Sequence, residues 1–424
     1  MKRLVTRILI MLAKWRLTHS KRPVIAVGGS IGKTSTKQAL ATILGTKMAV
    51  LTSDGGLNTE IGVPLVILEV KAPADAKSVI TWLRILVQAF VKAGMPFKHD
   101  VLLLELGVDH PGDMDLFKKL VHPKVAVITA ATSEHLEYFG SVEKAQAEEL
   151  KLASFSEKVV LSDDLVPEQL IAALDANDVL LYGSAKHCDY QLKVESFDLQ
   201  NGYQLSLKLK DALPVVAECH LLGEHSLQPV LAAAAAAREI GLSEKDIQAG
   251  IALLRPVAGR MQLLPGVERG SWIIDDSYNS VAPEPVIAAL KTLMSTKATQ
   301  HIAVLGSMNE LGSFSKQYHE EVGSFCDGKK LDFVVTIGKD AKEYLAPIAA
   351  LAGCEVKSYD TPVQAAEFVL SQLKPGGLVL VKGSQNKVFS EETVKLLLRS
   401  PADEAKLVRQ SPEWLAKKRA QGMI

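Results

Sequence analysis

The stretch VIAVGGSIGKTSTKQALATIL, residues 24–44, decides how the rest of the sequence is interpreted. Its first residues, Val24 to Val27, form a short apolar run of the kind found in buried strands. Glycines and small polar residues follow as far as Ser35, and beyond them apolar residues recur at helical spacing. A strand, a glycine-rich turn and a helix, in that order, are the context that a phosphate-binding loop requires.

The composition of this turn suits a bound nucleotide. Its glycines let backbone N–H groups face one phosphate, and the helix that follows adds its positive N-terminal end. We expect the phosphates of ATP to be bound by Gly29, Ser30, Gly32, Lys33, Thr34 and Ser35. Lys33 supplies a full charge to the β- and γ-phosphates, and Thr34 or Ser35 offers a hydroxyl to Mg²⁺. A strict Walker A motif has glycine where Val27 stands, so the alternative is an ordinary glycine turn before a helix.

Size, charge and cysteine content limit the class of protein. The 424 residues suffice for two or three domains with full cores. Basic and acidic residues number 48 each, so the net charge gives no reason to expect a nucleic-acid partner. The four cysteines lie far apart without a CxxC pair, and no cleavable signal peptide is evident. These features predict free thiols in a reducing, cytoplasmic compartment.

The first 22 residues are basic and apolar by turns. Leu4, Ile8, Met11, Leu12 and Trp15 fall on one helical face, while most of the basic residues fall elsewhere. The uninterrupted apolar run is far shorter than the ~20 residues that span a bilayer. Two alternatives therefore stay open: the helix lies on a membrane surface, or it packs its apolar stripe on the domain that follows.

Two further apolar runs, residues 101–106 and 125–129, indicate a parallel sheet with helices on both faces. Ligands of such sheets bind at the carboxyl ends of the strands. We therefore expect Glu105 and His135 to lie near Lys33 and Thr34, where a carboxylate and an imidazole can hold Mg²⁺. Taken alone, Glu105 would be interpreted as a solvated residue at a strand end.

The later part of the sequence predicts a second α/β domain. Residues 159–220 alternate in polarity, which suggests antiparallel strands added to the first sheet. Residues 256–265 have the composition of a linker. Four apolar runs, at residues 272–276, 301–306, 333–338 and 378–383, then predict a smaller doubly wound domain. We divide the chain into an N-terminal helix (1–22), a central ATP-binding domain (23–258), a C-terminal domain (259–400) and a tail helix (401–424).

Several longer motifs make residues 23–395 resemble the Mur ligases. GSIGKTSTK, LNTEIGVP, LLELGVDHPGDM, SEHLEYFGS, DDSYNS and VKGSQN occur in the order seen in that family. The resemblance implies a P-loop-containing parallel-sheet ATPase domain followed by a Rossmann-like domain, with ATP and Mg²⁺ as cofactors. In the implied chemistry, ATP phosphorylates a substrate carboxylate and an incoming amine displaces phosphate to form an amide.

The motifs look most like the branch that joins D-alanyl-D-alanine to a UDP-N-acetylmuramoyl-tripeptide in peptidoglycan synthesis. Only 22 residues precede the loop strand, so we expect the family's N-terminal UDP-binding domain to be missing. Three functions stay open: the same reaction, an amide ligase on a lipid-linked cell-wall precursor, or a non-catalytic nucleotide-binding partner. Retention of Lys33, Thr34, Glu105 and His135 disfavours the third.

The resemblance also assigns roles to single residues. Thr34 and Glu105 bind one Mg²⁺, and His135 helps to bind a second. Lys151 is our candidate for the carbamylated lysine of the family, with an ordinary solvated lysine as the alternative. The nucleotide would also contact His225, Arg260 and one of Asp275 and Asp276, although His225 fits a capping or core histidine equally well. Substrate binding falls to Asn58, Thr59, Tyr278, Asn279, Lys382 and Ser384.

Overall fold

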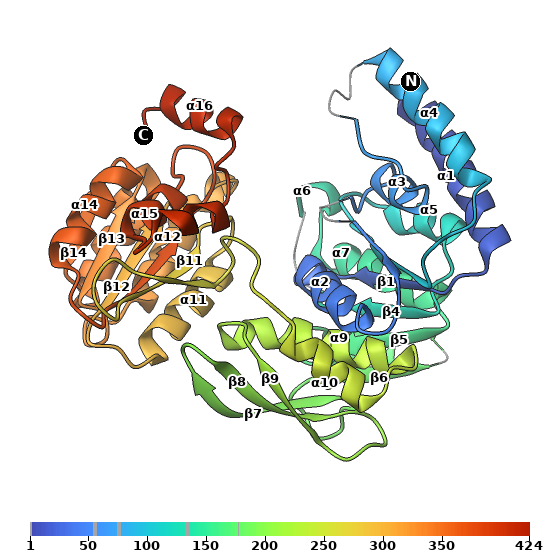
Figure 1. Ribbon diagram of the computed structural model, residues 1–424, viewed down its shortest axis with the longest axis horizontal. Helices are drawn as coiled ribbons and strands as arrows, with labels where there is room; N and C mark the ends of the chain where they lie inside the picture. The colour runs from blue at the N-terminus through green and yellow to red at the C-terminus, as the bar shows by residue number, and fades with distance from the viewer. Residues whose placement is uncertain (1, 54–56, 74–77, 132–135, 177) are drawn as a thin grey trace. The chain divides into compact units, whose positions relative to one another are not determined.

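The computed structural model describes residues 2–53, 57–73, 78–131, 136–176 and 178–424, and the chain divides into two compact units (Figure 1). Unit 1 consists of Met1–Phe197, Tyr203–Cys219 and Ser226–Leu254. Unit 2 consists of Asp198–Gly202, His220–His225 and Arg255–Ile424.

Unit 1 is built around a six-stranded parallel sheet. In spatial order its strands are β2 (Val50–Leu51), β3 (Val101–Glu105), β1 (Val24–Gly28), β4 (Val125–Ile128), β5 (Lys158–Ser162) and β6 (Val179–Tyr182). Every residue of β1, β3 and β4 is buried, as expected of strands that are covered on both faces. The predicted strands at residues 24–27, 101–106 and 125–129 are confirmed.

Ten α-helices accompany this sheet in the described part of unit 1. They are α1 (Lys2–Ser20), α2 (Lys33–Leu44), α3 (Gly62–Ile67), α4 (Val79–Ala93), α5 (Asp113–Leu120), α6 (Leu136–Phe139), α7 (Val142–Leu150), α8 (Glu168–Ala172), α9 (Leu227–Glu239) and α10 (Glu244–Ala252). Helix α2, which follows the phosphate loop, packs against α9. The fully buried alanines 232–237 of α9 suit this contact, because their small side chains let the two helices approach closely.

One face of α1 belongs to the core of unit 1. Val5, Leu9, Leu12 and Ala13 are buried, and α1 contacts α3 and α4. Helix α1 thus packs on the domain that follows it, but the stripe predicted to make this contact is wrong: Leu12 is buried, whereas Leu4, Met11 and Trp15 are exposed. None of the helices in the described ranges has the length and apolarity to cross a bilayer.

Strands β7 (Gln191–Asp198), β8 (Gly202–Lys208) and β9 (Val215–Cys219) form a separate three-stranded sheet. The expected antiparallel pairing is confirmed for β8 and β9, but the prediction that such strands are added to the main sheet is wrong. Instead, β5 and β6 join that sheet in parallel, and β7 to β9 lie apart from it. The reason is polarity: β7 has no buried residue and β8 is buried mainly at alternate positions, so neither suits a sheet covered on both faces.

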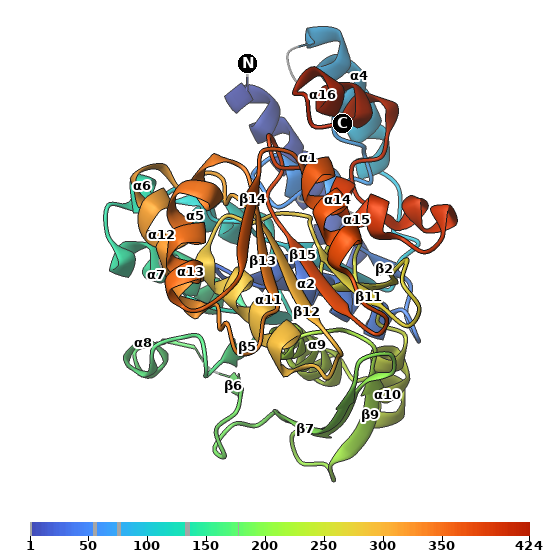
Figure 2. The ribbon, with the colours of Figure 1, turned by 90° about the vertical axis from the view of Figure 1, so that its left-hand side faces the viewer.

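Unit 2 contains a second six-stranded sheet (Figure 2). Its spatial order is β10 (Gln262–Pro265), β11 (Trp272–Asp276), β15 (Leu378–Lys382), β12 (His301–Gly306), β13 (Phe333–Ile337) and β14 (Val356–Tyr359). Only β10 is antiparallel to its neighbour. All four predicted strands are confirmed. The linker expected at residues 256–265 is wrong for residues 262–265, which form the edge strand β10.

Helices cover both faces of this second sheet. They are α11 (Pro283–Ser295), α12 (Ser315–Phe325), α13 (Ala346–Leu351), α14 (Pro362–Gln372) and α15 (Glu391–Leu397). The last helix, α16 (Pro412–Ala420), contacts Glu391 and Glu392 of α15 through Lys418. Successive residues of β11 face two different cores: Ile274 packs in the core that includes α11 and α12, and Ile273 in the core that includes α14 and α15. Short helical turns occur in both units, at Lys151–Phe155, Glu224–Ser226, Gly312–Phe314, Ala341–Leu345 and Pro401–Lys406. The predicted doubly wound architecture is confirmed.

Candidate active site

The loop between β1 and α2 has a shape that requires glycine at two positions. The backbone φ is 118° at Gly29 and 84° at Gly32, in the region where other residues are strained. A Cβ atom on Gly29 would lie 2.4 Å from Oγ1 of Thr129, just after β4. That hydroxyl also lies 3.1 Å from the carbonyl oxygen of Gly28 and 2.6 Å from that of Ile31. The end of β4 therefore fixes the loop.

Lys33 begins α2, and its amine lies over the loop. Its Nζ donates a hydrogen bond to the carbonyl of Gly29 and another, at 2.8 Å, to that of Ser30. Its side chain is half-buried, as are those of Thr34 and Ser35, so these polar groups gather at the N-terminal end of α2. An accumulation of N–H groups, a helix N-terminus and a lysine can bind a phosphate group.

Glu105 ends β3 and is held by three side chains. The hydroxyl of Thr34 donates to its two carboxylate oxygens at 3.0 and 3.2 Å. Nδ2 of Asn58 donates to Oε1 at 3.2 Å, and Nζ of Lys37 lies 3.1 Å from Oε2. Glu105 reaches this position because β3 pairs with β1 so that Glu105 lies opposite Val27. The structure thus brings Thr34, Glu105 and Asn58 together beside the loop.

Sequence reasoning missed Lys37. Its side chain is only 1% exposed, and its amine also donates to Oγ of Ser53 at 3.0 Å. An ammonium group this deeply buried needs a paired carboxylate, which Glu105 provides. A signal was present, because Lys37 shares the inward face of α2 with Leu40 and Leu44 at helical spacing.

Two carboxylates near the end of α7 were also missed. Oε2 of Glu149 accepts a hydrogen bond from the N–H of Gly29 at 3.0 Å. Oε1 of Glu148 accepts from the N–H groups of Gly112 and Met114, each at 3.0 Å, at the start of α5. Both glutamates are 5% exposed. No motif marks them, because their partners lie far away in the sequence.

Lys151 lies beside this pair and pairs with carboxylates. Its Nζ is 2.9 Å from Oε2 of Glu148 and 3.0 Å from Oδ2 of Asp115, and its side chain is 39% exposed. The hydrogen bond to Glu148 raises the pKa of this amine, which favours the ammonium over the neutral form that reacts with CO₂. The carbamate at Lys151 stays a prediction. His135, predicted to bind a metal, lies outside the described residues.

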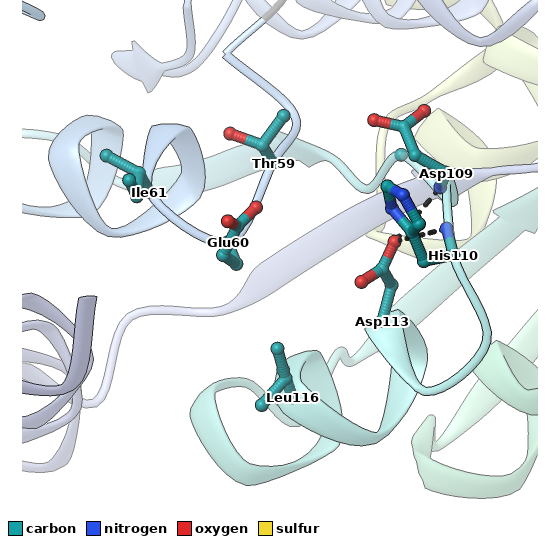
Figure 3. Close-up of a pocket in the computed structure, with 8 residues that line it drawn as sticks. Thr59, Glu60, Ile61, Asp109, His110, Asp113 and Leu116 are labelled. Atoms are coloured by element: carbon teal, nitrogen blue, oxygen red, sulfur yellow. Dashed lines mark hydrogen bonds between the residues drawn. The ribbon is translucent and has the colours of Figure 1, made fainter. Parts of the chain in front are cut away.

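A pocket of about 290 Å³ lies beside this site (Figure 3). One of its lining residues, Gly107, donates its N–H to the carbonyl of Asn58 at 2.8 Å. It is lined by Thr59, Glu60, Ile61, Gly107, Asp109, His110, Asp113 and Leu116. Oδ2 of Asp113 accepts hydrogen bonds from the N–H groups of Asp109 at 3.0 Å and His110 at 2.8 Å, which shapes one wall. The predicted substrate residue Thr59 thus lines a pocket. Asn58, the residue before it in the sequence, contacts Glu105 beside the phosphate loop.

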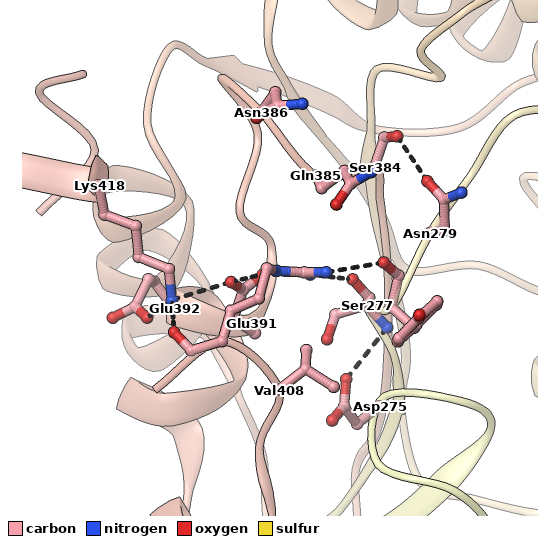
Figure 4. Close-up of polar contacts among 12 residues, drawn as sticks. Asp275, Ser277, Asn279, Ser384, Gln385, Asn386, Glu391, Glu392, Val408 and Lys418 are labelled. Atoms are coloured by element: carbon pink, nitrogen blue, oxygen red, sulfur yellow. Dashed lines mark hydrogen bonds and ion pairs between the residues drawn. The ribbon is translucent and has the colours of Figure 1, made fainter. Parts of the chain in front are cut away.

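The other predicted residues lie in unit 2, where two strand ends adjoin. Asp276 of β11 pairs in register with Lys382 of β15, and their side chains form a buried ion pair of 2.7 Å. Nζ of Lys382 also approaches the carbonyl of Asn279 at 3.4 Å. Oγ of Ser384 donates to Oδ1 of Asn279 at 3.0 Å (Figure 4). The structure therefore joins Asp276, Asn279, Lys382 and Ser384 into one polar cluster.

Four more predicted residues lie in unit 2. Asp275 is fully buried, and this burial raises the pKa of its carboxyl to about 6. Burial lowers the pKa of His225, an effect that the charge of Asp276 opposes. The guanidinium of Arg260 lies over the ring of Tyr278, 4.4 Å from its centroid.

The C-terminal tail supplies a further residue that sequence reasoning missed. Arg409 donates to the carbonyls of Ser277 at 2.6 Å and Tyr278 at 2.8 Å, immediately after β11. The same guanidinium forms a two-bond ion pair with Glu391, each bond 2.8 Å long. Lys418 of α16 completes the arrangement, 2.8 Å from Oε1 of Glu391 (Figure 4). The tail thus holds the segment that carries Tyr278 and Asn279.

Comparison with protein families covers most of the chain. Residues 27–237 match the Mur ligase middle domain, and residues 259–385 match the family described as "Mur ligase, glutamate ligase domain". The first match begins inside β1 and includes the phosphate loop and Glu105. The second includes the polar cluster of unit 2.

Curated relatives and solved structures agree with these matches. The chain is 29% identical to the UDP-N-acetylmuramoyl-tripeptide–D-alanyl-D-alanine ligase of Bacillus subtilis over 394 residues, 92% of this chain and 79% of that protein. It is 27% identical to the Escherichia coli protein of the same name, over 91% of this chain and 79% of that protein. The MurF ligase of Thermotoga maritima in complex with ADP has a similar fold, with a TM-score of 0.73, 24% identity, and coverage of 94% of this chain and 84% of that one.

Proposed function

The chain belongs to the Mur ligase family, and we propose that it joins D-alanyl-D-alanine to a UDP-N-acetylmuramoyl-tripeptide in peptidoglycan synthesis, with ATP as the energy source. The names of its curated relatives support this substrate pair, since the likeness extends over about nine tenths of the chain. The observation that carries the proposal is the phosphate loop, in which Lys33 lies over Gly29 while Thr34 contacts Glu105.

In the proposed reaction, ATP first activates the carboxylate of the tripeptide. A carboxylate oxygen bonds to the γ-phosphorus of ATP, and the bond from that phosphorus to the β–γ bridging oxygen breaks, which releases ADP. The amine of D-alanyl-D-alanine then attacks the acyl carbon, and inorganic phosphate leaves with the carboxylate oxygen while the amine loses a proton. Lys33 and the loop N–H groups stabilise the charge on the transferred phosphoryl group.

Thr34 and Glu105 fit a magnesium ion, because both offer oxygen atoms and lie in hydrogen-bonding contact beside the loop. Bound Mg²⁺ would supply positive charge to the β- and γ-phosphates. Lys37 pairs with the Glu105 carboxylate and fixes its orientation. We further propose that His135 takes part in a second magnesium site.

The carbamate on Lys151 is also a proposal. Its test is Lys151→Ala: activity lost in this variant and restored by short-chain carboxylic acids would support the carbamate. Full activity of Lys151→Ala without any added acid would exclude it.

In unit 2 we propose nucleotide contacts for Arg260, His225 and Asp275 or Asp276, and substrate contacts for Tyr278, Asn279, Lys382 and Ser384. The ion pair of Lys382 with Asp276 supports this division, because it holds the lysine amine in place beside the Asn279 carbonyl. In unit 1, Asn58 and Thr59 take the corresponding role beside the pocket of Figure 3.

The test is phosphate release from Mg·ATP. We expect release only when the UDP-linked tripeptide and D-alanyl-D-alanine are both present, with formation of the pentapeptide. Lys33→Ala is the control for the phosphate loop. Phosphate release with a lipid-linked muramoyl peptide, but not with the UDP-linked tripeptide, would favour the second function, a ligase for lipid-linked precursors. No turnover with either carboxylate would favour a non-catalytic nucleotide-binding partner.

A further inference from the structure

Helix α4 is apolar on two opposite sides, and among the residues that the structure describes, protein covers one side and leaves the other exposed. Trp82, Ile85, Ala89 and Ala93 face the core of unit 1. The other side carries Val79, Ile80, Leu83, Val87, Phe90 and Val91, whose exposed fractions range from 55% to 67%. These six positions recur at helical spacing and so form one stripe. An exposed apolar stripe of this size marks an interaction site.

Helix α1 lies beside α4 and repeats the pattern (Figure 1). Its inner face is in the core, but Leu4, Met11 and Trp15 are 64%, 62% and 42% exposed. Tryptophan is enriched where membranes meet water, because its ring is apolar and its N–H is polar. We call the exposed apolar and basic residues of α1 and α4 the apolar-basic face.

The charged side chains that α1 and α4 themselves carry are all basic. Neither helix contains an aspartate or glutamate, although together they span 34 residues. Arg7, Lys14 and Arg84 are exposed, and within the described part of the chain no ion pair holds any of them. This separates the face from the whole chain, which has as many acidic as basic residues. The face therefore complements a surface that is apolar beneath and negatively charged above.

A second copy of the chain fits this face poorly. In a twofold dimer through α1 and α4, the basic residues of one chain would face the same basic residues of the other chain. Neither helix has an acidic residue that could pair with them. Like charges at a desolvated interface oppose association. Helices that lie flat on a bilayer, in contrast, combine an apolar side with flanking lysine and arginine.

We propose that the apolar-basic face docks on the surface of an anionic phospholipid bilayer, with α1 and α4 lying in the plane of the interface. The apolar stripe enters the boundary between headgroups and acyl chains, and Arg7, Lys14 and Arg84 contact lipid phosphates. Docking would bring unit 1, with its phosphate loop, to the membrane surface. The proposal goes beyond the ligase function, since binding to lipid requires neither nucleotide nor peptide.

The test is flotation of the full chain with vesicles of phosphatidylcholine, with and without phosphatidylglycerol. We expect binding to the vesicles that contain phosphatidylglycerol, and release from them at high salt, because salt screens the headgroup charges. The triple variant Arg7→Gln/Lys14→Gln/Arg84→Gln should bind anionic vesicles about a hundredfold more weakly. The triple variant Leu83→Gln/Val87→Gln/Phe90→Gln should lose binding altogether.

A matched control uses exposed apolar residues elsewhere. Leu213 and Leu351 are 87% and 83% exposed, so Leu213→Gln/Leu351→Gln makes the same chemical change off the face and should bind like the unaltered chain. All of these variants should unfold at the temperature of the unaltered chain, because the altered side chains are exposed.

Four results would overturn the proposal. They are no flotation of the unaltered chain, equal binding to neutral and anionic vesicles, equal binding by the apolar triple variant, and a dimer in solution that this variant dissociates. The last result would identify the face as a contact between copies of the chain. Loss of ligase activity in a variant that still floats would concern the proposed function alone.

Discussion

At the scale of single residues, the phosphate loop adjoins a buried carboxylate that three side chains hold in place. Glu105 is 3% exposed and would be costly to bury as a lone charge. Lys37 compensates that charge, while Thr34 and Asn58 donate to the same carboxylate. The two lysines, four residues apart, thus have different roles. Lys33 bonds to the carbonyls of the loop, and Lys37 pairs with the Glu105 carboxylate.

The two lysines can be separated by mutation. Lys37→Met leaves the Glu105 carboxylate buried without its cation and should lower the free energy of unfolding by about 3–5 kcal/mol. Lys33→Met should abolish ATP turnover while leaving stability within about 0.5 kcal/mol, because Lys33 is half-buried and bonds only to carbonyls. Denaturant unfolding and an ATPase assay measure the two effects. Equal stability of the two variants would contradict these assignments.

A second residue-scale prediction concerns pH. Burial raises the pKa of Asp275 from 3.8 to about 6, so between these values the folded chain retains a proton that the unfolded chain has lost. The stability that this group contributes is full below about pH 4 and is lost as the pH rises through 6, by about 3 kcal/mol in all.

Asp275→Asn should remove this dependence. The unfolding free energy of the variant minus that of the unaltered chain should therefore be about 3 kcal/mol higher at pH 8 than at pH 4. Denaturant unfolding across this pH range measures the difference. Asp360→Asn, at a side chain 78% exposed, is the control and should show little change. A constant difference between Asp275→Asn and the unaltered chain at every pH would contradict the account.

At the scale of elements, helices at the two ends of the chain are both tied into their units by buried cations. In α16, Lys418 is fully buried between Glu391 and Glu392, at 2.8 and 2.6 Å. In α1, Arg16 donates to the carbonyl of Ile67 at 2.8 Å and pairs with Glu69 at 2.5 Å. Both helices are therefore fixed to their units, and hydrophobic patterning alone would not have revealed these buried ion pairs.

For α16 the matched substitution lies one residue away. Lys418→Met should cost about 3–5 kcal/mol of stability, because two buried carboxylates lose their cation. Lys417→Met, whose amine contacts Asn386 and the ring of Trp414 near the surface, should cost about 1 kcal/mol or less. Thermal unfolding compares the two variants directly. Similar melting temperatures would show that the tail does not hold the segment after β11.

For α1, Arg16→Met should lower the free energy of unfolding by about 3 kcal/mol, since two carbonyls and Glu69 lose a buried donor. Lys14→Met, at an exposed position of the same helix, should change it by no more than about 0.5 kcal/mol. Denaturant unfolding provides the measurement. An unfolding free energy of Arg16→Met equal to that of Lys14→Met would mean that α1 is not part of the core.

At the scale of the whole molecule, the predicted elements are those with strong local patterns. Strands β1, β3, β4, β12, β13 and β15 are continuous apolar runs, so they were predicted with nearly correct bounds. Strand β5 is also largely buried, but it was assigned to the alternating segment that follows it. The edge strands β10 and β14 were missed because both are only partly buried, and β10 ends in a proline. Strand ends also placed Glu105 beside Thr34 and Lys382 beside Asp276, as the geometry of parallel sheets dictates.

Long-range partners away from the strand ends were beyond prediction. Glu149 contacts Gly29 across 120 residues of sequence, and Arg409 contacts Ser277 across 132. Nothing in either local pattern indicates its partner, because these contacts follow from the path of the whole chain. Lys37 was predictable in part. Helical spacing indicates its inward position, but nothing in the local sequence indicates its ion pair with Glu105.

The central claim is that the loop of Lys33 binds an ATP whose γ-phosphoryl group passes to a substrate carboxylate. The most direct measurement uses tripeptide substrate labelled with oxygen-18 in that carboxylate, with D-alanyl-D-alanine and Mg·ATP. The account predicts that each inorganic phosphate released with the amide product carries one labelled oxygen, and that Lys33→Ala releases none. Amide formed with unlabelled phosphate, or with the label in AMP, would contradict it.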